Sequence, residues 1–195
     1  MGVLTIGTVA AGVGLFAALY VGYRRENTAA VVNTAAAVCL TVVPPTAGWV
    51  FGEGPAGDGV VPLTFAVAVA GFLHALGMLG RYESVWWWDH LTHTLSAALL
   101  TALLYAGLLV LAPGLAVAGA LLGTLVLGVI WEVGELIARE VARRYDIEPV
   151  LIHYGRRDTA LDLVFDLVGA ALIVALDVRA FLPLAESVAR AVGVA

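Results

Sequence analysis

Three aspartates at helical spacing open the last long apolar segment of the chain. Asp158, Asp162 and Asp166 are four residues apart, so in an α-helix their side chains stack on one face over two turns. Nearly all residues between and after them are apolar. Carboxylates within an apolar membrane helix are rare and usually functional. The spacing therefore indicates a functional site on this face.

Two further pairs of ionisable residues stand at the ends of other apolar segments. Asp89 precedes His93 by four residues and Glu132 precedes Glu135 by three, so each pair lies on one helical face. Carboxylates crowded in a medium of low dielectric repel each other, by about 4 kcal/mol for a pair 4 Å apart at an effective dielectric constant of 20. They therefore need protons, arginines or a metal ion.

Carboxylates and imidazole together form the donor set of a divalent metal site. Oxygen-rich sets favour Mg²⁺ or Mn²⁺, and imidazole also suits Zn²⁺ and iron. The candidate metal ligands are Asp89, His93, Glu132, Glu135, Asp162 and Asp166. The candidate catalytic groups among them are Asp89, His93, Glu132 and Asp162. The expected cofactor is a divalent metal ion, Mg²⁺, Mn²⁺ or Zn²⁺.

Structural roles are the alternative for several of these residues. Asp158 stands before an apolar run and would serve as the N-cap of the last long helix. For Glu132, Asp162 and Asp166, the alternative is a hydrogen-bonded or arginine-paired network between helices. His74 lies alone in an apolar segment, which is typical of a packing histidine, although its depth makes it a further site candidate.

The composition identifies an integral membrane protein. The 195 residues are 62% hydrophobic and 13% charged, with a mean hydropathy of +0.98, outside the range of ordinary soluble domains. Because no polar linker interrupts the chain, residues 1–195 are expected to form a single membrane domain surrounded by lipid. The single cysteine, Cys39, excludes a disulfide framework. The net charge of −5 argues against a nucleic-acid partner.

Six apolar segments are long enough to cross a hydrocarbon core about 30 Å thick. They cover approximately residues 3–22, 29–51, 60–80, 90–112, 115–138 and 159–177. This pattern predicts an all-α fold, a polytopic transmembrane helix bundle. Pro44 and Pro45 are expected to kink or end the second helix. A short interfacial helix is expected at 181–192, where Glu186 precedes Arg190 by four residues.

The arginines predict the orientation, because cytoplasmic loops collect basic residues. With the N-terminus outside, eight of the ten basic residues fall in cytoplasmic loops, and only Arg179 and Arg190 fall outside. We therefore expect a multi-pass protein of the cell membrane with both termini extracytoplasmic.

This topology brings the three ionisable clusters to one depth. They stand at the start of the fourth segment, near the end of the fifth and at the start of the sixth, all on the cytoplasmic side. At a rise of 1.5 Å per residue, His93, Glu132 and Asp162 lie within roughly 10 Å of the membrane boundary. We expect them to share one site.

These motifs resemble those of the VanZ-like and YjdF-like integral membrane proteins. The family pattern is Asp-x-x-x-His opening one helix, Glu-x-x-Glu or Glu-x-x-Gln closing the next, and Asp-x-x-x-Asp followed by Gly-Ala. The matching positions, within roughly residues 80–175, are Asp89, His93, Glu132, Glu135, Asp158, Thr159, Asp162, Gly169 and Ala170. Asp166 stands where a VanZ-like protein tends to have Asn, and Arg157 where the YjdF-like pattern tends to have Trp, so the chain resembles an outlying member. The resemblance implies a helical membrane fold and these site residues.

The leading functional hypothesis is a metal-dependent enzyme that acts on a lipid or lipid-linked phosphate from the cytoplasmic leaflet. Arg156 and Arg157 would hold the phosphate at the interface. A cation or proton transporter that uses the same carboxylates is one alternative. Against it, the outer halves of the last three segments are almost purely apolar. A structural or regulatory membrane protein without catalysis is the other alternative, since no unambiguous nucleophile is present.

Overall fold

Long apolar runs form the helices of this chain, because in lipid a helix satisfies its backbone hydrogen-bonding groups internally. The computed structural model describes residues 2–151 and 155–194, which form helices and turns with no strand. The elements are α1 (Val3–Arg24), α2 (Thr28–Val50), α3 (Val60–Leu76), a π-helical turn (Gly77–Arg81), α4 (Tyr82–Ser84), α5 (Trp88–Leu111), a 3₁₀ turn (Pro113–Leu115), α6 (Ala116–Tyr145), α7 (Arg156–Ala175) and α8 (Leu182–Ala191). The predicted all-α bundle is confirmed.

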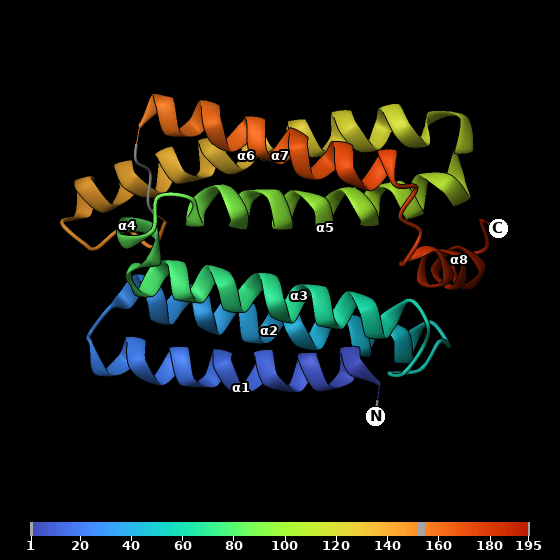
Figure 1. Cartoon of the computed structure of the whole chain (residues 1–195), viewed down its shortest axis with the longest axis horizontal. Helices are drawn as coiled ribbons and strands as arrows, with labels where there is room; N and C mark the ends of the chain where they lie inside the picture. The colour runs from blue at the N-terminus through green and yellow to red at the C-terminus, as the bar shows by residue number, and fades with distance from the viewer. Residues whose placement is uncertain (1, 152–154, 195) are drawn as a thin grey trace.

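The long helices form two groups that lie side by side. Helices α1, α2 and α3 pack on one another, and α5, α6 and α7 form a second group, which meets the first mainly between α3 and α5 (Figure 1). Both termini lie at one end of the bundle. The start of α5, the end of α6 and the start of α7 lie at the opposite end, so the three ionisable clusters share one level.

Glycines set the close contacts within both groups. On α1, Gly7 and Gly14 make room for the rings of Phe65 and Phe72 of α3, which a Cβ at either glycine would meet at 2.5 Å. Gly119 and Gly123 of α6 likewise lie against leucine side chains of α5, which a Cβ at Gly119 would meet at 2.8 Å and one at Gly123 at 3.0 Å. Small residues therefore let neighbouring helices approach where lipid provides no hydrophobic driving force.

Five helical segments among the described residues are long and apolar enough to cross a membrane. They are Val3–Arg24, Thr28–Val50, Val60–Ser84, Trp88–Leu111 and Pro113–Tyr145. Helix α7 has 20 residues and packs against α5 and α6, but its first eleven residues include two arginines and three aspartates. A sixth crossing by α7 therefore stays a prediction.

Helix α2 ends within one residue of its predicted end, whereas α6 extends further than predicted. Helix α2 continues through Pro44 and Pro45 to Val50, so the prolines do not end it. Helix α6 continues seven residues beyond the predicted end at residue 138. In this exposed extension Arg143 Nε donates to Glu140 at 2.9 Å, a spacing of three residues that supports a helix in water.

Helix α8 confirms the short helix expected at 181–192 and runs across the long axis of the bundle (Figure 1). Phe181 and Leu184 are buried in a cluster with residues of α3 and α5. The hydroxyl of Ser187 donates to Glu53 and accepts from Arg190. The apolar face of α8 thus closes the end of the bundle that carries both termini.

The predicted orientation can be tested by cysteine labelling of intact cells. Cys39 is exposed, so the background variant is Cys39→Ala. Arg144 is exposed at the site end, and a Cβ at Gly114, in the turn at the other end, would meet no atom within 4 Å. A membrane-impermeant maleimide should label Gly114→Cys and leave Arg144→Cys unlabelled until the cells are opened. The reverse pattern would place the ionisable clusters on the extracytoplasmic side.

Candidate metal centre

Helices α5 and α7 approach each other so closely that only glycine fits at position 169. A Cβ on Gly169 would lie 2.2 Å from the carbonyl oxygen of Thr94 and 3.0 Å from the amide nitrogen of Ala98, both on the backbone of α5. This contact lies on the turn that directly follows His93 on α5, between Thr94 and Ala98. It therefore places the imidazole against the aspartates of α7.

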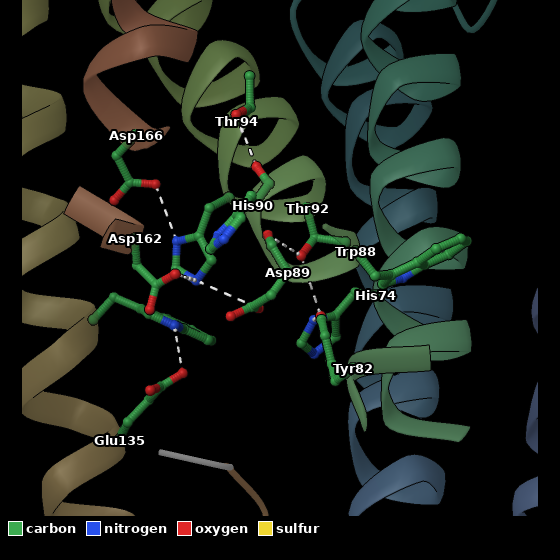
Figure 2. Close-up of polar contacts among 12 residues, drawn as sticks. His74, Tyr82, Trp88, Asp89, His90, Thr92, Thr94, Glu135, Asp162 and Asp166 are labelled. Atoms are coloured by element: carbon green, nitrogen blue, oxygen red, sulfur yellow. Dashed lines mark hydrogen bonds and ion pairs between the residues drawn. The ribbon is translucent and has the colours of Figure 1, made fainter. Parts of the chain in front are cut away.

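His93 lies among three carboxylates. Its Nδ1 is 3.1 Å from Asp166 Oδ1, while its Nε2 is 3.8 Å from Asp162 Oδ1 and 3.9 Å from Asp89 Oδ1. Figure 2 shows the carboxylates of Asp89, from α5, and of Asp162 and Asp166, from α7, gathered in one region. The two nitrogens of the ring thus have different surroundings.

The short contact fixes the tautomer of a neutral His93. An ionised carboxylate can only accept, so Nδ1 donates its proton to Asp166 and the lone pair of the ring is on Nε2. The distances from Nε2 to Asp89 and Asp162 are too long for hydrogen bonds. One donor atom each of Asp89, His93 and Asp162 lies within 4.8 Å of the other two, a grouping that could hold a metal ion.

Two buried carboxylates lack hydrogen-bond partners among the described residues. Both oxygens of Glu132, a residue only 4% exposed, and Oδ1 of Asp162, 2% exposed, have no such partner. Buried polar groups are nearly always paired, because an unpaired one has lost its hydration without compensation. Unpaired acceptors of this kind are expected where a cation or a proton belongs.

Asp166 occupies a different position from the other aspartates of α7. It is 6% exposed, and its second oxygen lies over Gly128 of α6, where a Cβ would be 2.6 Å away. Since its first oxygen holds His93 Nδ1, Asp166 orients the ring instead of facing the Nε2 side. This carboxylate–histidine pair is the usual outer partner of a metal-bound histidine.

Other predicted site residues lie outside this grouping. Glu135 accepts from Trp131 Nε1 at 3.0 Å on the exposed side of α6. The N-cap of α7 is Gly155, so the prediction of Asp158 as N-cap is wrong. Asp158 is the third residue of the helix, where a carboxylate still interacts favourably with the helix dipole. Arg156 and Arg157 are exposed in the same first turn.

His74 belongs to a separate polar group. Its Nδ1 is 2.6 Å from the hydroxyl of Tyr82, and its Nε2 is 3.3 Å from Asn33 Oδ1. The sequence analysis did not single out Tyr82 or Asn33. Two glycines before Tyr82 could have drawn attention to it in the sequence. Gly80 has a φ of 114°, which turns the chain, and Gly77 leaves room for the ring of Tyr82.

Comparison with known proteins identifies a family. Residues 6–182 match the family described as "Predicted membrane protein (DUF2238)". A curated relative from Thermotoga maritima, described as "Uncharacterized protein", is 31% identical over 106 residues, which cover 50% of this chain and 52% of that protein. The chain thus spans about half the length of this relative. No solved structure matches. The VanZ-like and YjdF-like resemblance is not tested by these matches.

Because α5 and α7 approach so closely, we expect a single methyl group added at position 169 to lower the stability of the fold. Gly169→Ala should destabilise the protein by about 1–3 kcal/mol, because the helices must move apart to admit the Cβ. The matched control is Gly107→Ala in α5, where a Cβ meets nothing within 4 Å. Thermal unfolding in detergent should show a lower melting temperature for the first variant only. Equal melting of both variants would show that the contact is looser than described.

Proposed function

We propose that this chain, which belongs to the DUF2238 family of predicted membrane proteins, binds a divalent metal ion between α5 and α7 and acts on a lipid or lipid-linked phosphate. The arrangement around His93 Nε2 carries the proposal. The lone pair of His93 Nε2 faces Asp89 Oδ1 at 3.9 Å and Asp162 Oδ1 at 3.8 Å, distances that are too long for hydrogen bonds. An ion between these three groups would coordinate all of them.

The distances suit an ion after a small contraction. Zinc and magnesium bind oxygen and nitrogen donors at about 2.0–2.2 Å, so two ligands on one ion are at most about 4.4 Å apart. The three donor atoms lie within 4.8 Å of one another, so binding would draw them together by a few tenths of an ångström or more. Rotation of the aspartate side chains supplies such movement without a shift of the helices.

The charges also support a cation. Asp89, Asp162 and Asp166 lie within 4 Å of one imidazole. In the described ranges, neither these three carboxylates nor that of Glu132 forms an ion pair with an arginine. A divalent ion would offset two of the negative charges. We assign Asp89, His93 and Asp162 as ligands, and Glu132 as a fourth ligand or the base that takes a proton from water.

The start of α7 supports a phosphate substrate. Arg156 and Arg157 are exposed in the first turn of the helix that carries Asp162, and a helix N-terminus itself favours anions. Guanidinium groups bind phosphate through paired hydrogen bonds. A bound metal would act as a Lewis acid on a phosphoryl oxygen or on a water molecule. The VanZ-like and YjdF-like resemblance is part of this proposal, since it selects the same carboxylates and histidine.

Transport of a cation or proton is less well supported. Beyond Asp166, towards the other end of the bundle, the described residues of α5 and α6 form a buried polar contact between Thr101 and Thr124, whose hydroxyls are 2.7 Å apart. Thr101 also donates to the carbonyl of Ala97 in its own helix, so these hydroxyls bond locally. A purely structural role for the carboxylates is the remaining alternative, and metal analysis separates it from the proposal.

We expect Asp162→Asn to lower both metal content and thermal stability, because the change keeps the size of the side chain and removes one charged ligand. Chelator should lower the melting temperature of the wild type and have little effect on the variant. The measurements are elemental analysis of protein purified in detergent and melting curves with and without chelator.

The matched control for this experiment is Asp177→Asn. It removes an equal charge just beyond the opposite end of α7, where Asp177 accepts from Tyr105 and Arg179. Its metal content should equal that of the wild type. If chelator does not affect the wild type and Asp162→Asn melts at the same or a higher temperature, the carboxylates form a structural network.

The substrate class can be tested with a phosphomonoester lipid. In mixed micelles of phosphatidic acid, the metal-loaded protein should release inorganic phosphate, and the double variant Arg156→Gln, Arg157→Gln should raise KM about tenfold with little change in kcat. Arg179→Gln, at the other end of the bundle, is the control. Absence of phosphate release with Mg²⁺, Mn²⁺ and Zn²⁺ would contradict a phosphomonoesterase activity.

A further inference from the structure

A chain of polar side chains connects α2 and α3 with the first turn of α5. It consists of Asn33, His74, Tyr82 and Thr92, and ends at the backbone carbonyl of Asp89, which accepts from Thr92 Oγ1 at 2.9 Å. In Figure 2, His74, Tyr82 and Thr92 lie on the other side of Asp89 from the aspartates of α7. The chain is therefore separate from the metal centre but reaches one of its ligands.

The direction of the hydrogen bonds follows from the amide of Asn33. Its Nδ2 donates to the carbonyl oxygens of Ala29 at 2.9 Å and Val150 at 2.6 Å, so Oδ1 is left to accept. His74 Nε2 then carries the proton and donates to Oδ1. In the neutral ring Nδ1 accepts, and the hydroxyl of Tyr82 donates to it at 2.6 Å.

Tyr82 is held tightly in this position. Its ring lies so close over Gly77 that a Cβ there would be 2.3 Å away, and the positive φ of Gly80 turns the chain to bring the ring back. The hydroxyl oxygen, fixed by His74, lies 3.4 Å from Thr92 Oγ1. Because the proton of Tyr82 goes to His74 and that of Thr92 goes to the carbonyl of Asp89, these two oxygens are in packing contact. Thr92 is buried, so its hydroxyl stays between Tyr82 and the carbonyl of Asp89.

The first turn of α5 depends on such lateral contacts. The helix has no side-chain hydrogen bond at its N-cap, Trp87. Trp88 donates its Nε1 proton to the carbonyl of Leu73 in α3 at 3.0 Å, which ties the turn to the same neighbour. Since Asp89 follows directly, the helices α2 and α3 influence where its carboxylate lies.

We propose that the Asn33–His74–Tyr82 chain positions the Asp89 turn of α5 for metal binding, with Tyr82 and His74 as positioning residues that do not touch the ion. The inference rests on the proposed metal function. The α1–α3 group contributes no ligand to the proposed site. In this proposal it holds one ligand, Asp89, at the distance that the ion requires. Outer partners of metal ligands typically change affinity by about 10–100-fold.

Titration of the purified full chain with Co²⁺ tests the proposal, because the visible spectrum of Co²⁺ reports both binding and coordination geometry. Tyr82→Phe removes one hydroxyl and keeps the ring on Gly77, and Thr92→Val removes the hydroxyl between Tyr82 and Asp89 at nearly constant shape. Each should weaken Co²⁺ binding about tenfold and change the spectrum, at an unchanged melting temperature. Because both act through one chain, the double variant should lose little more than either single variant.

The matched control is Tyr105→Phe, which removes a hydrogen-bonded tyrosine hydroxyl near the other end of α5. It should bind Co²⁺ like the wild type. Wild-type affinity and spectrum in Tyr82→Phe, or an equal loss in Tyr105→Phe, would overturn the positioning role and leave the metal centre in place. A wild type that binds no Co²⁺ would overturn the proposed function and this inference together.

Discussion

Carboxylates buried inside an apolar bundle impose the main constraint on this structure. Removal of a charged carboxylate from water costs several kcal/mol even after relaxation, and a like-charged neighbour adds to the cost. Asp162, Asp166 and Glu132 are nevertheless all buried. The bundle must therefore provide compensating groups, and His93 provides part of the compensation because its Nδ1 donates to Asp166.

The close contact of α5 and α7 makes this compensation possible. Gly169 brings the helix backbones together on the turn that follows His93, and Gly128 of α6 leaves room for the second oxygen of Asp166. Both glycines lie in helix interiors, where glycine is unfavourable by about 1 kcal/mol relative to alanine. Glycine is nevertheless needed at both positions, because a side chain there would separate the imidazole from its carboxylates.

The fold was largely predictable, since runs of about twenty apolar residues allow few structures in lipid. The common depth of His93, Glu132 and Asp162 followed from helix order and the rise per residue. Rotation of the helices about their axes was not predictable. This rotation decides that Asp166 faces Nδ1 of His93, and that Asp89 and Asp162 face Nε2 of the same ring. It also decides that Glu135 faces Trp131. These choices depend on side-chain packing between helices, which periodicity does not encode.

Helix α5 makes different contacts on its two sides, and these contacts correspond to the two helix groups of the bundle. Towards α7, the helix contributes Asp89 and His93 to a polar centre whose partners all lie in the second helix group. Towards α3, it presents Trp88 and Thr92 to neighbours that hold its first turn. A helix with carboxylates on one face needs support on another, because repulsion among these groups would otherwise push them apart. The α1–α3 group supplies that support through its contacts with Trp88 and Thr92, and in the proposed metal centre it would thereby help to set the position of Asp89.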